Sequence, residues 1–267
     1  MSRRSALIVT QSDNKRPIEC PFPGGRVAIY SNQSPHKHTG NEDSAAVLTL
    51  DDESGILVVA DGVGGLPAGG QASELTVKEL AAEIRKKQDI PVRSLILNAI
   101  EQANEKLLAL RTGTATTVCV LEVNGNIIRP YHVGDSACIV AGQRGLIKLQ
   151  TMPHSPTGYG LAAGLIDEQE ALSHDERHLI SNMVGASDMR IEIGTEFKLS
   201  PRDTVVMASD GLFDNLLTDE IVKIIRKGPL LKAAIRLAAV VRNRMRHREG
   251  HADDLTFILY RQKSDLA

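Results

Sequence analysis

Residues 56–65 read Ile-Leu-Val-Val-Ala-Asp-Gly-Val-Gly-Gly, an aliphatic run that stops at an aspartate and a glycine-rich turn. The run is rich in β-branched residues and predicts a buried strand, and residues 45–50 form a second such run. Glycine is a common turn residue, so the turn alone has an ordinary structural explanation. The alternative is that Asp61, placed where a strand ends, binds a cation that the carbonyl of Gly62 can also approach closely.

Other segments of the chain also place acids beside a predicted strand: Asn41-Glu42-Asp43, Ser209-Asp210-Gly211 and Asp253-Asp254. Each of them, taken alone, is equally typical of a solvated turn. Carboxylates gathered at the rim of a sheet, with few histidines or cysteines among them, favour hard cations such as Mg²⁺ and Mn²⁺. Two such ions side by side are a common device for attacking a phosphate ester with water.

The composition narrows the class of protein. Of 267 residues, 42% are apolar and 24% are charged, which is ordinary for a globular protein with a sizeable core. There is no Trp, and only four Phe and four Tyr, which argues against modules that stack bases on aromatic side chains. The formal net charge is −2, and the basic run 242–248 ends a predicted helix, where cations are favourable. We therefore expect no nucleic-acid partner.

The compartment follows from cysteine usage and hydropathy. Cys20, Cys119 and Cys138 are odd in number and scattered, which favours free thiols in a reducing compartment. The sequence has no apolar run near the roughly 18 residues that span a membrane. The apolar run 6–9 is too short for the core of a signal peptide. We expect a cytoplasmic protein with no membrane partner.

Strand and helix patterns alternate in blocks along the chain. Strands are predicted at residues 27–30, 45–50, 56–60, 114–123, 127–133, 137–140, 146–149, 204–209 and 255–260. Helices are predicted at residues 69–87, from Pro91 through Leu107, and at 167–174, 218–226 (with Thr218 as the cap) and 229–248. Consecutive hairpins indicate antiparallel sheets, and helices that arrive in pairs suit the outer faces of sheets. The pattern predicts an α+β fold of two packed sheets with helices outside.

Domain boundaries are expected only near the ends of the chain. Residues 1–25 are polar and rich in proline and glycine, which favours an N-terminal arm or an irregular strand and turn. Residues 26–262 are expected to form a single domain, and residues 263–267 a tail. The proline- and glycine-rich stretch 151–166 is predicted to be a loop.

Five motifs in this order resemble the metal-dependent protein phosphatase family (PPM, type 2C) of serine/threonine phosphatases, in its bacterial form. They are Asn41-Glu42-Asp43, Asp61 to Gly65, Gly134-Asp135-Ser136, Ser209 to Asp214 and Asp253-Asp254-Leu255-Thr256. The resemblance covers roughly residues 27–260. It implies a four-layer α-β-β-α sandwich, two antiparallel sheets flanked by helix pairs, with a flap segment at about 151–185.

The resemblance also implies roles for the acids. Asp61 would bridge two Mn²⁺ or Mg²⁺ ions, and the Gly62 carbonyl would bind one of them. Asp210 and Asp253 would hold the other ion. A hydroxide bridging the two metals would then attack the phosphorus of phosphoserine or phosphothreonine directly. The implied partner is a phosphorylated protein, in opposition to a serine/threonine kinase.

Further acids are implied around this pair of ions. Asp135 and Asp214, with Asp210, would make a third metal site. Glu42 and Asp43 would lie in the outer shell and orient metal-held waters.

The chain departs from the family pattern at two positions. His38 lies where members commonly have an arginine that grips the substrate phosphate, so either His38 or the neighbouring Lys37 is expected to do so. Val63 lies where some members have a histidine that acts as a general acid. Two alternatives therefore stay open: a catalytically weak, phosphoprotein-binding regulatory module, and a phosphatase of a small phosphorylated metabolite.

Overall fold

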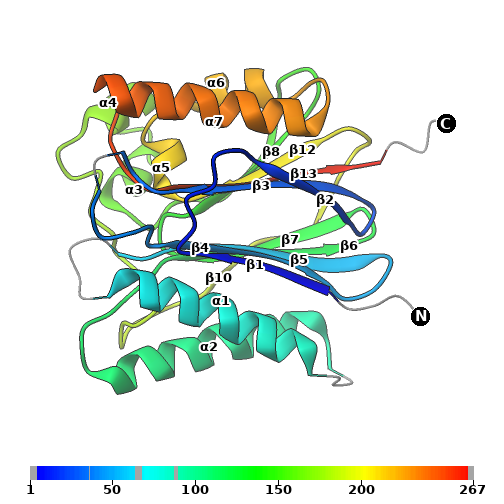
Figure 1. Cartoon of the computed structure of the whole chain (residues 1–267), viewed down its shortest axis with the longest axis vertical. Coiled ribbons are helices and arrows are strands. Elements are labelled where there is room, and N and C mark those ends of the chain that lie inside the picture. Colours follow the sequence, from blue (N-terminus) through cyan, green and yellow to red (C-terminus); the bar gives the residue numbers. More distant parts are fainter. Residues whose placement is uncertain (1–4, 36, 64–67, 87–89, 264–267) are drawn as a thin grey trace.

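Four layers make up the molecule in the computed structural model, which describes residues 5–35, 37–63, 68–86 and 90–263. Two antiparallel sheets pack face to face. Helices α1 and α2 cover the outer face of one sheet, and α6 and α7 cover that of the other (Figure 1). The predicted α+β sandwich of the α-β-β-α type is confirmed.

Within the described residues, the first sheet has seven strands and the second has six. The first contains β1 (Ser5–Thr10), β4 (Asp43–Thr49), β5 (Ser54–Asp61), β6 (Val118–Asn124), β7 (Ile127–Val133) and β10 (Glu192–Ile193), in that order, and β11 (Phe197–Lys198) also pairs with β7. The second contains β2 (Ile18–Phe22), β3 (Gly25–Asn32), β13 (Leu255–Gln262), β12 (Thr204–Ala208), β8 (Ala137–Ala141) and β9 (Ile147–Gln150).

The long helices lie where their patterns predict them. The helices are α1 (Gly69–Arg85), α2 (Val92–Leu110), α3 (Pro156–Ala162), α4 (Glu168–Ser173), α5 (Asp210–Phe213), α6 (Thr218–Ile225) and α7 (Leu230–His247). One detail differs, because Thr218 is the first residue of α6 and Leu217 occupies the cap position. In the first turn the Thr218 N–H donates to the Glu168 carboxylate at 3.0 Å, and the Glu220 N–H donates to the Leu217 carbonyl at 2.9 Å. These donors are therefore satisfied without a hydroxyl cap.

Residues 5–22 differ from the expected arm, because they supply an edge strand to each sheet. β1 pairs with β4, with Leu7 opposite Val47, and β2 pairs with β3. Pro21 is tolerated in β2 because an edge strand leaves one row of N–H groups unpaired. The ends of the chain, residues 1–4 and most of the expected tail (264–267), lie outside the described residues.

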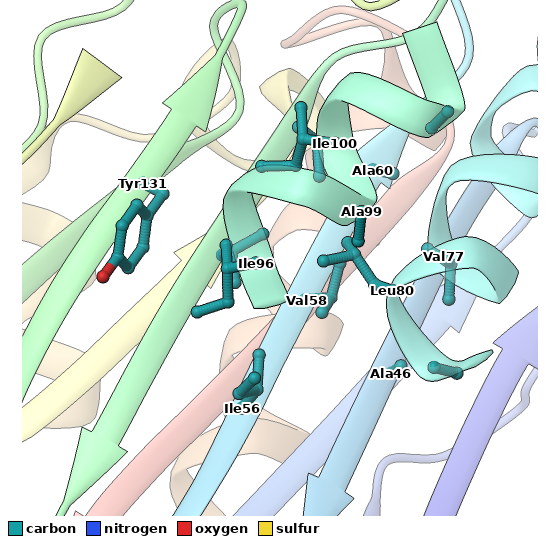
Figure 2. Packing of buried hydrophobic residues seen from close by; sticks show 14 of the residues in the cluster. Ala46, Ile56, Val58, Ala60, Val77, Leu80, Ile96, Ala99, Ile100 and Tyr131 are labelled. Atoms are coloured by element: carbon teal, nitrogen blue, oxygen red, sulfur yellow. The ribbon is translucent and has the colours of Figure 1, made fainter. Parts of the chain in front are cut away.

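Both faces of the central strands are buried, which explains their continuous apolar sequences. Val58 and Ala60 of β5 face the helices, whereas Leu57 and Val59 face the other sheet. Figure 2 shows Val58 and Ala60 beneath Ile96, Ala99 and Ile100 of α2 and near Leu80 of α1. Alternation along a strand therefore separates two apolar cores rather than a core from solvent.

The register of the strands brings four of their ends to one edge of the sandwich. β4 begins at Asp43, directly opposite Asp61 at the end of β5. In the second sheet, Ala208 at the end of β12 lies opposite Phe257 near the start of β13. The acid-bearing segments therefore meet where the two sheets end together. In the described part of the chain, no helix is both long and apolar enough to cross a membrane.

Candidate metal centre

The predicted ligand acids lie together at this edge. Asp61 ends β5 of one sheet and Asp210 begins α5 just after β12 of the other, yet the charge of Asp210 acts on Asp61. The charges of Asp253 and Asp135 act on both of them, and the charge of Asp214 also acts on Asp210. The structure thus brings together five carboxyl groups that are separated by up to 192 positions between Asp61 and Asp253.

Burial and mutual repulsion dominate the electrostatics of the centre. Burial, followed by the charges of neighbouring acids, raises the pKa of Asp61 and of Asp210 well above its usual range. The same causes raise the pKa of Asp43 to about 7. For Asp135 and Asp214, burial is again the largest cause and raises the pKa to about 6 and about 7, respectively. Such a set is stable in its ionised form only with added positive charge.

The oxygen atoms of these acids also suit a hard cation. Among the described residues, Asp135, Asp210 and Asp43 each bury one carboxylate oxygen, Oδ1, that has no hydrogen-bond partner. Arg177 provides positive charge, but its Nε lies 3.9 Å from Asp214 Oδ2, in a partly exposed pair. Unpartnered, repelling carboxylate oxygens are the donor set that Mg²⁺ and Mn²⁺ prefer, so the residues present fit the implied ions.

Backbone contacts fix the position of Asp61. Its carbonyl accepts hydrogen bonds from Thr116 Oγ1 at 2.7 Å and from the Thr117 N–H at 2.8 Å. The Gly62 N–H donates to the Glu42 carbonyl at 3.2 Å, and a Cβ on Gly62 would lie 2.3 Å from the Gly69 backbone. Only glycine fits where the start of α1 packs this closely. The predicted metal contact of the Gly62 carbonyl stays a prediction, and Gly64 and Gly65 lie outside the described residues.

Gly211 permits an equally close approach on the other sheet. A Cβ at this position would lie 1.9 Å from the backbone oxygen of Asp254. Nearby, Ser209 Oγ donates to Asp43 Oδ2 at 2.9 Å and accepts from the Thr256 N–H at 3.2 Å. These contacts join α5 to the turn that carries Asp253, so the two segments are held as one unit.

We predict that Gly211→Ala separates these two segments and weakens the fold. The added methyl group meets backbone, which cannot rotate away, and overpacking of this kind costs about 1–3 kcal/mol or more. Urea unfolding would measure the loss. Gly160→Ala is the matched control, because its Cβ would meet only the Ile166 side chain, at 3.2 Å, and that side chain can move. Equal stability of the two variants would contradict the prediction.

Lys37 is held by carboxylates of the protein itself. Its Nζ lies 2.6 Å from Asp254 Oδ2 and 2.6 Å from Glu42 Oε2. Asp254 also accepts hydrogen bonds from the N–H groups of Ser34 and Glu42, each at 2.7 Å. Burial alone would lower the pKa of Lys37, but the hydrogen bonds to Asp254 and Glu42 raise it. These contacts indicate that Lys37 positions the loops, while His38 beside it is exposed. The predicted phosphate contacts of both residues stay predictions.

The Lys37→Met substitution is expected to lower the free energy of unfolding by roughly 3–5 kcal/mol, because it leaves the buried Asp254 carboxylate without its cation. Adding Asp254→Asn should recover part of this loss, since it removes the unpaired charge, although its NH2 group must face one of the two backbone N–H donors, Ser34 or Glu42. Lys78→Met is the control, because Lys78 pairs with Glu74 on an exposed helix surface. Chemical denaturation of the four proteins would show whether the double variant recovers. A double variant no more stable than Lys37→Met would contradict this account.

His154, which the sequence patterns do not single out, clamps the turn before Asp135. Its Nδ1 accepts hydrogen bonds from the Gly134 N–H at 3.2 Å and from Asn182 Nδ2 at 2.9 Å. The proton must therefore lie on Nε2, which donates to Glu192 Oε2 at 3.0 Å. His154 thus joins the Gly134 turn to the segment around Asn182.

His132, His154 and Glu192 also have the residue types of a metal site, and their candidate ligand atoms lie within 4.8 Å of one another. However, the two rings are stacked, with centroids 4.5 Å apart and planes 23° from parallel. Lone pairs of stacked rings lie in nearly parallel planes and do not converge on one ion. In addition, the Nε2 atom of His154 carries a proton and so has no lone pair for a metal ion. This cluster is therefore a hydrogen-bonded support for the Asp135 turn.

The chain is similar to known phosphatases along most of its length. The family model described as "Protein phosphatase 2C" matches residues 33–255. A putative protein phosphatase 2C-type from Streptococcus pyogenes is 33% identical over 200 residues, which are 71% of this chain and 80% of that protein.

Two solved structures extend the similarity to the fold. Stp1, a serine/threonine phosphatase from Staphylococcus aureus, has a TM-score of 0.80 at 24% identity and covers 92% of this chain and 98% of its own. The serine/threonine phosphatase of S. agalactiae has a TM-score of 0.75 at 26% identity and covers 89% and 99%. With a matching sequence model, a matching fold and clustered acids at the ends of its central strands, the chain belongs to the protein phosphatase 2C family.

Proposed function

We propose that this protein is a metal-dependent phosphatase that hydrolyses phosphoserine and phosphothreonine in proteins. The observation that carries the proposal is the set of buried and partly buried, mutually repelling carboxylates around Asp61 and Asp210, which requires added positive charge. The serine/threonine phosphatase named among the solved structures above supports the substrate class.

In this proposal Asp61, the Gly62 carbonyl, Asp210 and Asp253 hold two ions of Mn²⁺ or Mg²⁺. Asp135 and Asp214, with Asp210, hold a third. Divalent cations, when bound, activate water as a nucleophile near neutral pH and neutralise the charge that develops on phosphate oxygens.

The surrounding residues fix the orientation of the site. Ser209 donates to one oxygen of Asp43, so the other oxygen, which has no partner among the described residues, is free to accept a hydrogen bond from water. Lys37 restrains the Glu42 carboxylate. In this proposal the two acids, held in place in this way, would accept hydrogen bonds from metal-held waters and orient them, as outer-shell acids do.

The cellular partners follow from the substrate class. The proposed partner is a phosphorylated protein whose modification is made by a serine/threonine kinase. The cysteines Cys20, Cys119 and Cys138 are free, in keeping with a reducing compartment such as the cytoplasm.

Phosphate release from a phosphothreonine peptide tests the proposal. We expect release with Mn²⁺, none with EDTA, and a loss of at least about 100-fold with Asp253→Asn, because one ligand charge is removed. Asp219→Asn is the control, since the Asp219 side chain is 77% exposed and lies away from the centre. Release that continues in EDTA would rule out the metal mechanism.

The engaged Lys37 and the exposed His38 favour one alternative, a regulatory module that binds phosphoproteins without turning them over. A folded protein that binds both Mn²⁺ and the phosphopeptide but releases no phosphate would establish that alternative. Faster hydrolysis of small phosphorylated metabolites than of any phosphopeptide would establish the second alternative, a phosphatase of a small phosphorylated metabolite.

A further inference from the structure

A cavity of about 450 Å³ adjoins the proposed metal centre and is largely apolar away from it. Asp135, Asp210 and Asp214 line one end of the cavity. The rest is lined mainly by apolar side chains from the segment 151–172 and from the start of the α5–α6 region, among them Met152, Leu161, Leu172, Phe213 and Leu216. An apolar hollow that shares a wall with a phosphate-hydrolysing centre is placed to receive part of the substrate.

The apolar wall and the acids are rigidly connected. Helix α5 begins at Asp210 and is followed directly by Asp214, and Phe213 lies between them in the same turn. Asp210 and Asp214 line the acidic end of the cavity while Phe213 contributes to its apolar lining. A ligand group bound against Phe213 is therefore held at a fixed distance from the acids.

Helix α4 forms another wall and is tied to the body of the protein at two points. The Glu168 carboxylate accepts a hydrogen bond from the Thr218 N–H at 3.0 Å. The Leu172 carbonyl lies 3.1 Å from His251 Nε2, which donates to it. Glu168, Leu172 and Thr218 all line the cavity. Hydrogen bonds therefore hold this wall of the cavity in place.

Charge and size indicate the occupant. Asp135, Asp210 and Asp214 belong to the proposed metal centre, where bound ions would balance their charge. In the rest of the described lining, Glu168 is the one acid and Arg177 is the one base, and Arg177 is already paired with Asp214. This part of the cavity therefore offers no unpaired cation to a second phosphate or another anion. Apolar walls that are only partly buried gain free energy when an apolar group covers them. The volume accommodates a side chain as large as leucine or phenylalanine.

We propose that this cavity binds a large apolar side chain of the phosphoprotein substrate, within about three residues of the phosphorylated one. An extended peptide advances about 3.3 Å per residue, so a residue that close can reach a cavity that borders the acids. The inference rests on the proposed function, and it adds a sequence preference that the metal centre alone does not explain.

A peptide scan tests the preference. Phosphothreonine peptides of alanine, serine and glycine would carry a single leucine at each position from three residues before to three residues after the phosphothreonine. We expect leucine at one of these positions to raise kcat/KM by about tenfold over the alanine peptide, mainly by lowering KM, as burial of a leucine side chain would do. Equal kcat/KM for all the peptides would overturn the inference.

Two variants assign the preference to the cavity. Leu161→Gln makes its lining polar, and Ala171→Phe fills it from α4; in each, the ratio of kcat/KM between the leucine and alanine peptides should fall toward one. Leu165→Gln is the matched control, because Leu165 belongs to the same segment, is 79% exposed and should keep the ratio. A ratio that survives in both cavity variants would overturn the inference.

The small ester p-nitrophenyl phosphate separates this inference from the proposed function. Wild-type hydrolysis of that ester with Mn²⁺, without any leucine preference in peptides, would refute the cavity and leave the phosphatase intact. No metal-dependent hydrolysis of the ester or of any peptide would refute both.

Discussion

The Asp61→Asn substitution is expected to abolish metal-dependent phosphate release and, at the same time, to raise the melting temperature of the metal-free protein. Asp61 is partly buried, and the charges of Asp43 and Asp210 oppose its ionisation. Asparagine keeps the shape of the side chain and removes one repelling charge. The loss of an acid that would bridge two cations should lower kcat by about 10³-fold or more, the scale seen when a preorganised charge-stabilising group is removed.

The gain in stability is the more discriminating half of this prediction. Each kcal/mol of relieved repulsion should raise the melting temperature by about 2–4 °C in a protein of this size. Calorimetry in EDTA at pH 8 would measure it, with Asp219→Asn as the exposed control. An inactive variant with a lower melting temperature would mean that Asp61 supports the fold. An active variant would mean that it is not a ligand.

Local sequence was sufficient to predict where Asp61 and Asp210 lie, because each stands at the carboxyl end of an apolar strand: Asp61 is the last residue of β5, and Asp210 follows β12 after Ser209. Their meeting could not be derived in the same way, since it depends on the pairing of β12 with β13 and on the packing of two sheets. That the two acids meet at one site was predicted only from the resemblance of the ordered motifs to a known family. The order of the motifs thus identified the residues of the site, whereas the distances between them depend on tertiary packing.

The distinction between Asp253 and Asp254 shows where local sequence stops. Asp253 and Asp254 are the same residue type and lie next to each other before β13, so their local sequence does not tell them apart. In the structure Asp254 turns away into contacts with Ser34 and Lys37, while the charge of Asp253 acts on Asp210. The partners of Asp254 lie more than 200 positions earlier in the chain, so no local pattern reveals them.

Short and edge elements escaped prediction for a related reason. Helix α5 has four residues, too few for a periodic apolar pattern. Strand β1 is stabilised by pairing with β4, which lies some forty residues later in the chain, and its own apolar run, residues 6–9, is short and flanked by polar residues. Such elements depend on contacts with segments that are distant in the sequence, whereas β5 and α7 have a recognisable apolar pattern within their own sequences.

Stability of the metal-free protein is expected to fall as pH rises from about 4 to 8. The pKa values of Asp43 and Asp214 are raised to about 7, and that of Asp135 to about 6. In the unfolded chain an aspartate has a pKa of about 3.9. Between these values the folded protein binds more protons than the unfolded chain, so stability is retained at low pH and lost as pH rises through the folded-state values.

Mn²⁺ should reverse this slope, because cations replace the protons that hold the acids together. The gain in melting temperature on adding Mn²⁺ should therefore be larger at pH 8 than at pH 5, where protons compete for the same oxygens. Melting curves at both pH values, with EDTA or Mn²⁺, measure the four quantities required. The Asp210→Asn variant should show a shallower slope in EDTA, since it removes one of the repelling charges. A metal-free protein whose stability rises from pH 5 to pH 8 would show that these acids do not repel one another in the folded state, and the electrostatic basis for the metal centre would fail with it.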